Sequence, residues 1–329
     1  MQRLSIVLLC CAFLPVVSAP QARPQETREP FQWPSFRGPS ASGGSLAQAG
    51  NLSGQNYVVG GKNFDEQLVL CQITVAALES AGGSVTDRCN TGGTDVTRQA
   101  LLAGDINIYW EYTGTAWASF FKETRRITDD NELYNLVAQR DLEQNKIQWL
   151  DKANFNNTYA FAMTEAKSQE LGITTLSQMA DYIKAGKAPA GSMCVETEYN
   201  SRDDGLRGLE KTYGFTAQNP QVLATGVIYQ ATADNKCLFG EVFTTDGRIP
   251  GLKLKVLDDD KKYHVTYNAA PTIRADVYNA NPAVREVLAP IAQALDYNTI
   301  LDLNGKVSSF GQNERDVARE WLTQKGFIG

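Results

Sequence analysis

Short apolar runs alternate with longer segments of helical periodicity along most of the chain. A β-type run at 57–59 is followed by apolar residues that recur at helical spacing from Leu68 to Leu78, until Gly82 and Gly83 end the pattern. Asn63 offers an N-cap for this helix, and Glu66 stands three residues on, as in a capping box. The opening of the folded chain is therefore predicted to be a strand followed by a helix.

The same alternation continues to the C-terminus. Further strands are predicted at 84–88, 106–109, 159–164, 193–196 and 237–243, and further helices at 96–103, 176–183, 203–213, 226–233, 282–295 and 313–325. This order favours an α/β fold with largely parallel sheets that helices cover on both faces. We expect two α/β lobes, 55–155 with 256–329 and 156–255, joined by two crossings that form a hinge beside an interlobe ligand cleft.

The N-terminus has a different character. Residues 1–19 combine Arg3, an apolar stretch at 4–14 and a small-residue cleavage site ending at Ala19, which is typical of a secretory signal peptide. A lipoprotein signal is the alternative because Cys10 lies here, but Leu9 is a poor residue before a lipidated cysteine. Residues 20–54 are rich in Pro, Gly, Ser, Ala and Gln and are predicted to be a flexible linker. Export to the periplasm as a soluble protein is expected.

Composition and charge indicate the number of domains and limit the expected partners. The chain has 329 residues, 43% hydrophobic and 21% charged, which fits about two globular domains. Its formal net charge is -6, and no run of basic residues occurs. Nucleic acid is therefore not an expected partner.

Cysteine usage agrees with export. Four cysteines follow the predicted signal, and of their three possible pairings the positions favour Cys71 with Cys89 and Cys194 with Cys237. Zinc is the competing interpretation, but the chain has no C-x-x-C pair and a single histidine. We expect neither a metal nor a cofactor.

Enzyme motifs are missing from the sequence. There is no G-x-S-x-G, no H-E-x-x-H and no phosphate-binding loop. His264 has no sequence context that indicates a triad, and the carboxylates at 203–204 and 258–260 suit a helix start and a solvated loop. The chain is not expected to be an enzyme.

Four short segments instead place polar and aromatic residues at the ends of predicted elements: GGKNFDEQ at 60–67, NTGGTD at 90–95, EYTGT at 111–115 and NSRDDGL at 200–206. Together they resemble the OpuAC/ProX-type substrate-binding proteins of ABC importers for glycine betaine, choline, carnitine and related osmoprotectants. The resemblance implies a type 2 periplasmic-binding-protein fold. It also implies a monomer that captures a quaternary ammonium ligand and delivers it to a membrane permease.

The resemblance further implies two kinds of ligand contact. Aromatic rings attract a trimethylammonium group and bury its methyls, whereas basic groups and a hydroxyl hold a carboxylate. The implied rings are Tyr112, Tyr159, Tyr229 and Phe243, and the implied carboxylate contacts are Lys62, Thr115 and Arg202. Phe243 departs from the family, which usually has a tyrosine there.

Each of these residues also has an ordinary explanation. Tyrosines are commonly half-buried core residues, and lysine or arginine is commonly a solvated surface charge. Two alternatives to a quaternary amine receptor therefore stay open. One is a protein of the same fold that binds an amino acid or another small zwitterion, and the other is an exported enzyme on the same scaffold.

Overall fold

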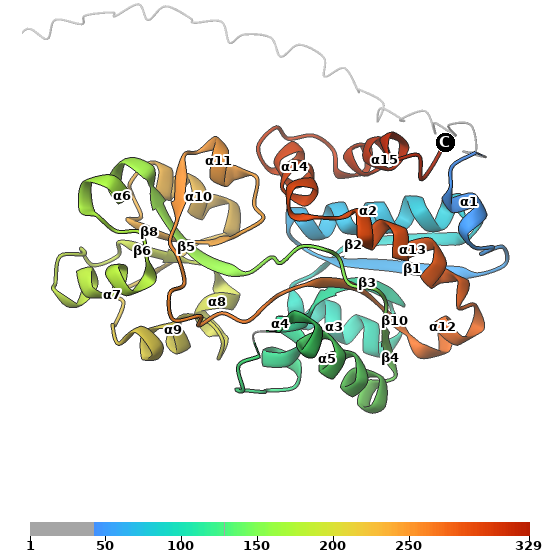
Figure 1. Ribbon diagram of the computed structural model, residues 1–329, viewed down its shortest axis with the longest axis horizontal. Coiled ribbons are helices and arrows are strands. Elements are labelled where there is room, and N and C mark those ends of the chain that lie inside the picture. Colours follow the sequence, from blue (N-terminus) through green and yellow to red (C-terminus); the bar gives the residue numbers. More distant parts are fainter. Residues whose placement is uncertain (1–42, 128) are drawn as a thin grey trace, which may run out of the picture. The chain divides into compact units, whose positions relative to one another are not determined.

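Two five-stranded sheets organise the described part of the chain, which is residues 43–127 and 129–329 of a computed structural model (Figure 1). The first sheet has the order β2 (Ser84–Gly92), β1 (Asn56–Lys62), β3 (Ile108–Tyr112), β10 (Ala269–Arg274) and β4 (Ile147–Trp149). The second has the order β7 (Gln221–Val222), β6 (Met193–Val195), β8 (Phe239–Phe243), β5 (Tyr159–Thr164) and β9 (Leu254–Val256). We call the parts built on them the first and second lobes.

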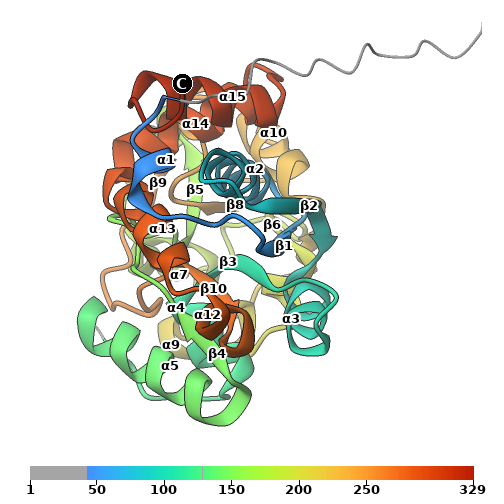
Figure 2. The same ribbon diagram turned by 90° about the vertical axis from the view of Figure 1, so that its right-hand side faces the viewer.

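Helices cover both faces of the first sheet (Figures 1 and 2). One face carries α1 (Leu46–Ala49), α2 (Asp65–Ser80), α13 (Ala283–Ala294), α14 (Tyr297–Ser308) and α15 (Glu314–Gln324). The other carries α3 (Thr94–Ala103), a π-helical turn at Ala116–Phe120 that follows α4 (Thr113–Thr115), and α5 (Asp130–Asn145). The short α12 (Ala275–Ala280) follows β10. Because α2 lies between the sheet and α13–α15, almost its whole circumference is buried.

The second sheet carries the remaining helices: α6 (Glu165–Leu171), α7 (Leu176–Lys184), α8 (Thr197–Ser201), α9 (Leu206–Tyr213), α10 (Thr225–Ala233) and α11 (Arg248–Gly251). Residues on β5 and β8 alternate between its faces. Phe161 and Phe239 belong to the same apolar cluster as α7 and α9, whereas Ala160 and Val242 pack with α10. This alternation places Tyr159 and Phe243 on the sheet face opposite α10.

The sheets are mixed, which corrects the expectation of largely parallel sheets. Strand β1 runs parallel to β2 and β3, but β10 is antiparallel to β3 and β4. In the second lobe β6 is parallel to β7 and β8, and β5 is antiparallel to β8 and β9. The antiparallel strands β5 and β10 are those the chain enters directly after crossing from the other lobe, so they are not preceded by a helical crossover within their own sheet.

Two crossings join the lobes, at about 150–158 and 257–268. They contact each other, since Asn156 and Asn268 form an antiparallel bridge and the Asn157 N–H donates to the Tyr267 carbonyl at 3.1 Å. The second crossing stays with the second lobe beyond residue 256, because the Asp259 carboxylate accepts from the Tyr213 hydroxyl at 2.5 Å. The chain returns to the first lobe later than we predicted.

The N-terminal boundary also differs from the prediction. Residues 1–42, which include the predicted signal and most of the linker, lie outside the described residues. Residues 43–54 belong to the fold, where Leu46 and Leu52 are buried and the Leu46 N–H donates to the Phe327 carbonyl at 3.0 Å. Two buried leucines and backbone hydrogen bonds together hold this polar segment in the fold.

Both disulfides have the predicted pairing. Cys71 and Cys89 join α2 to β2 with a Cα–Cα distance of 5.8 Å, and Cys194 and Cys237 join β6 to the segment before β8 at 5.7 Å. Each bridge lies within one lobe, so neither restricts the motion of one lobe against the other. Within the described residues, no helix has the length and apolar character needed to cross a membrane.

Candidate functional site

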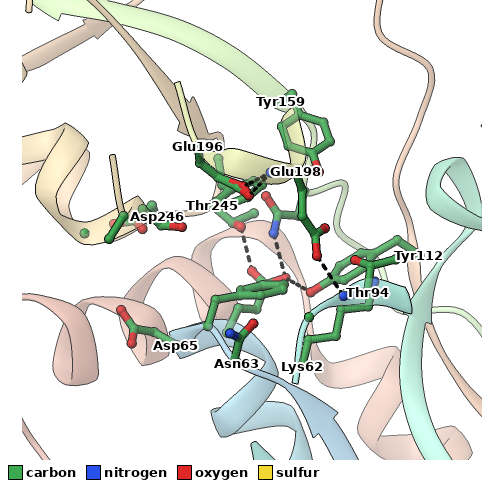
Figure 3. Close-up of a pocket in the computed structure, with 18 of the residues that line it drawn as sticks. Lys62, Asn63, Asp65, Thr94, Tyr112, Tyr159, Glu196, Glu198, Thr245 and Asp246 are labelled. Atoms are coloured by element: carbon green, nitrogen blue, oxygen red, sulfur yellow. Dashed lines mark hydrogen bonds between the residues drawn. The ribbon is translucent and has the colours of Figure 1, made fainter. Parts of the chain in front are cut away.

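A cavity of about 570 Å³ lies between the two lobes, at the ends of strands from both sheets (Figure 3). Lys62 and Tyr112 reach it from the ends of β1 and β3, and Tyr159 and Phe243 reach it from β5 and β8. The crossings contribute Asn157 and Tyr267. A cavity of this volume is typical of small-molecule sites.

Five aromatic rings line the cavity: Phe64, Tyr112, Tyr159, Phe243 and Tyr267. The ring of Phe64 stacks on Phe243 at 5.6 Å between centroids and on Tyr112 at 6.2 Å. Tyr159 lies 5.1 Å from Phe243 and 5.5 Å from Tyr267, to which it is nearly perpendicular. These rings form a continuous wall that crosses from one lobe to the other.

Six of the seven sequence-predicted residues line this cavity: Lys62, Tyr112, Thr115, Tyr159, Arg202 and Phe243. Tyr229 does not. It lies on α10, is fully buried with Ala160 and Val242 on the other face of the second sheet, and accepts a hydrogen bond from the Phe243 N–H at 2.9 Å. The helix that carries Tyr229 covers the sheet face that points away from the aromatic wall, so its ring supports β8 from behind.

The two basic residues expected to hold a carboxylate already have partners. Lys62 Nζ is 2.6 Å from Glu111 Oε1, and both side chains are buried. Arg202 donates from Nε and Nη2 to the two oxygens of Asp204, at 2.8 and 2.5 Å. Burial opposes ionisation of Asp204, but the hydrogen bond and charge of Arg202 outweigh it and lower the pKa of this carboxyl. The charges of both basic residues are therefore balanced by carboxylates of the protein itself.

Glu66 is a site residue that the capping-box prediction misplaced. The N-cap of α2 is Phe64, and the Glu66 carboxylate turns inward instead. It accepts hydrogen bonds from Tyr112 Oη at 2.8 Å, Asn157 Nδ2 at 2.9 Å, Thr245 Oγ1 at 2.6 Å and Asn304 Nδ2 at 2.8 Å. Burial raises the pKa of Glu66, and these four donors counteract that shift. Glu66 thus connects the first lobe, one crossing and the second lobe.

Two more carboxylates cross the cleft. Glu198, in the first turn of the second-lobe helix α8, accepts from the Thr94 N–H at the start of α3 in the first lobe at 2.8 Å (Figure 3). Asp65 in the first lobe pairs with Arg248 in the second. Negative charge at a helix N-terminus is favourable. These contacts hold the lobes together around the cavity, so the structure represents a closed arrangement.

The lining residues that were not predicted from the sequence include Phe64, Glu66, Asn157, Glu198 and Tyr267. A usable signal existed for the first two, because both belong to the GGKNFDEQ segment. Asn157 precedes Tyr159 by two residues at the end of the first crossing. Tyr267 and Glu198 lie in segments without a distinctive pattern.

The sequence model of a family described as "Substrate binding domain of ABC-type glycine betaine transport system" matches residues 55–324. The chain belongs to this family. It is therefore a substrate-binding protein of the ABC-importer type, and the resemblance drawn from the four segments is confirmed.

Three proteins of similar sequence are named for the ligands that they bind. The glycine-betaine-binding protein of Pseudomonas aeruginosa is 35% identical over 285 residues, which cover 85% of this chain and 91% of that protein. The glycine betaine-binding protein YehZ of Escherichia coli is 31% identical over 278 residues, covering 82% and 90%. EgtU of Helicobacter pylori, an ergothioneine transport permease and binding protein, is 29% identical over 270 residues, covering 82% of this chain and 47% of EgtU.

A solved structure supports the fold. Apo YehZ from Escherichia coli aligns with a TM-score of 0.63 at 30% sequence identity, over 83% of this chain and 99% of that one. Together with the strand orders above, this confirms the two-lobed periplasmic-binding-protein fold expected from the sequence.

Proposed function

We propose that the cavity binds a quaternary ammonium compound by its trimethylammonium group, and that the closed protein delivers this ligand to the permease of an ABC importer. The observation that carries the proposal is the wall of five rings, Phe64, Tyr112, Tyr159, Phe243 and Tyr267. The glycine betaine and carnitine ligands named for relatives of this chain all contain such a group.

The chemistry of the ligand explains why rings suit it. A trimethylammonium ion has no N–H to donate, and its charge is spread over methyl groups. Aromatic faces attract this charge through their quadrupoles and also bury the methyls, at about 0.5–2 kcal/mol for each desolvated face. Because Tyr112 belongs to the first lobe and Tyr159 and Phe243 to the second, a ligand between them favours the closed arrangement.

The remaining expectations belong to the same proposal. Residues 1–19 direct export to the periplasm, the protein acts as a monomer, and it binds its ligand without a cofactor and without catalysing a reaction. Thr115 lines the cavity and offers its hydroxyl to the ligand.

A thermal-shift panel of quaternary amines and amino acids tests the proposal. A ligand at about 100 times its dissociation constant stabilises the bound form by roughly 2.7 kcal/mol, which corresponds to a rise of about 5–10 °C in melting temperature. We expect such a rise with at least one quaternary amine and none with amino acids. A rise with amino acids alone would replace the proposal with the same fold serving amino acid uptake.

A further inference from the structure

The charges around the cavity constrain what the ligand carries at the end opposite its trimethylammonium group. Three basic side chains line the cavity: Lys62, Arg202 and Arg248. Each is paired with protein carboxylates, Lys62 with Glu111, Arg202 with Asp204, and Arg248 with Asp65 and Asp246. Among the described residues, the cavity therefore contains no basic side chain that lacks a carboxylate partner.

Acidic side chains outnumber basic ones in the same wall, five against three. Asp65 and Asp246 pair with Arg248. For Glu66, Glu196 and Glu198, no lysine, arginine or histidine nitrogen lies within 4.0 Å in the described parts of the chain. The cavity wall therefore has more acidic groups than basic ones to balance them.

Hydrogen-bond donors of the protein are directed at each of these three carboxyl groups. Glu66 accepts from four donors, and Glu198 accepts from the Thr94 N–H at 2.8 Å. Both oxygens of Glu196 accept from the Glu198 N–H. Burial raises the pKa of Glu66 and Glu196, and these donors act against that shift.

Glu241 lies behind this wall and does not add to its charge. Its side chain is buried, Oε2 accepts from the Glu196 N–H at 2.8 Å, and burial raises its pKa to about 8. Glu241 is therefore mostly protonated at neutral pH.

We propose that the preferred ligand is a quaternary ammonium cation whose other end is uncharged and donates hydrogen bonds, such as an alcohol or a primary amide, and that ligands ending in a carboxylate bind less tightly. This inference rests on the proposed function, because it concerns the same cavity. A carboxylate entering the cavity would compete with Glu111 or Asp204 for a cation and would be repelled by Glu196 and Glu198. A hydroxyl or amide donor finds acceptors there instead.

Isothermal titration of the mature protein with three probes separates charge from shape. Glycine betaine and its primary amide differ only in the terminal group, a carboxylate against a neutral carboxamide of nearly the same size, and choline supplies the alcohol. We expect the amide and choline to bind at least about tenfold more tightly than glycine betaine. Equal affinity for glycine betaine and its amide, or tighter binding of glycine betaine, overturns the inference and leaves the proposed function intact. If none of the three binds, the inference is overturned, and the thermal-shift panel decides the proposed function.

A charge-neutral variant gives an independent test. Asp204→Asn removes the charge that neutralises Arg202, so the preference for the amide over glycine betaine should shrink at least about fivefold. Asp203→Asn is the matched control, since Asp203 is the exposed neighbour and the same charge is removed. A folded Asp204→Asn protein with an unchanged preference refutes the role given to the Arg202–Asp204 pair. Should that variant not fold, the three-probe titration of the unmodified protein still decides.

Discussion

Replacing Tyr159 by leucine tests the aromatic wall at its centre. The ring of Tyr159 lies 5.1 Å from Phe243, 5.5 Å from Tyr267 and 4.9 Å from Tyr199, and the side chain is buried. Leucine keeps an apolar surface but removes the quadrupole. The substitution therefore isolates the attraction between ring and cation better than alanine, which would also leave a large void.

The expected loss follows from one desolvated ring. At about 0.5–2 kcal/mol, the dissociation constant for choline should rise roughly twofold to thirtyfold. Tyr159→Phe is the matched control, because the Tyr159 hydroxyl makes no hydrogen bond to another residue that the structure describes. Phenylalanine retains the ring, so its dissociation constant should stay within about threefold of the original.

Isothermal titration measures both variants against the unmodified protein. Circular dichroism at the titration temperature establishes that each variant is folded, because removing a ring packed on three others also lowers the free energy of unfolding, by roughly 1–3 kcal/mol. If the leucine variant binds choline as tightly as the phenylalanine variant, the ring of Tyr159 does not contact the cation.

Three further predictions concern stability. Glu66→Gln leaves buried donors without an acceptor and should lower the free energy of unfolding, measured in urea, by about 1–3 kcal/mol. Glu79→Gln, at an exposed position of α2, is the control and should leave this free energy nearly unchanged. Equal effects of the two substitutions would refute the role of Glu66. Glu241 has a pKa of about 8 in the folded protein and about 4.3 in the unfolded chain, so its stabilising contribution is complete below about pH 4.3 and is lost as the pH rises through 8. Between these values the free energy of unfolding should fall by up to about 1.4 kcal/mol per pH unit. Glu241→Gln should remove this dependence, and stability curves of the two proteins that run parallel from about pH 5 to 8 would contradict it. Replacing Cys194 and Cys237 together by alanine opens a loop with a sequence separation of 43 and should cost about 4 kcal/mol in urea unfolding, and a cost below about 1 kcal/mol would contradict the entropic account.

The resemblance to a known family provided the best-predicted part of the site. It implied Tyr112, in the EYTGT segment, and Tyr159, at the start of a predicted strand, as rings around the ligand, and both line the cavity. The disulfides were predictable from the positions of the cysteines, since each pair lies within one α/β unit.

The face that a helix presents to the sheet, and contacts between residues far apart in the chain, were harder to predict from the sequence. Tyr229 lies on a helix, and whether its ring reaches the cavity depends on which face of the sheet that helix covers. Neither residue spacing nor composition predicts that face. The helix predicted from residue 203 begins at Leu206, which leaves Asp204 in the preceding turn, where it pairs with Arg202. Glu66 fits a capping box locally, but partners up to 238 residues away in the chain draw its side chain inward.

The same limit explains the strand directions and the N-terminal boundary. Strands β5 and β10 are antiparallel to their neighbours because they arrive from the other lobe, which local periodicity does not reveal. Residues 43–54 have a linker-like composition, and they are held in the first lobe by the burial of Leu46 and Leu52 and by backbone hydrogen bonds to distant parts of the chain.

Isothermal titration with choline and with its neutral tert-butyl analogue, in which carbon replaces the ammonium nitrogen, tests the central claim most directly. The two molecules have nearly the same shape and apolar surface, so only the positive charge distinguishes them. If the rings of the cavity hold a methylated cation, choline binds at least about tenfold more tightly than the analogue. Equal affinities would show that the cavity recognises apolar shape alone and would contradict the proposed recognition of a quaternary ammonium group.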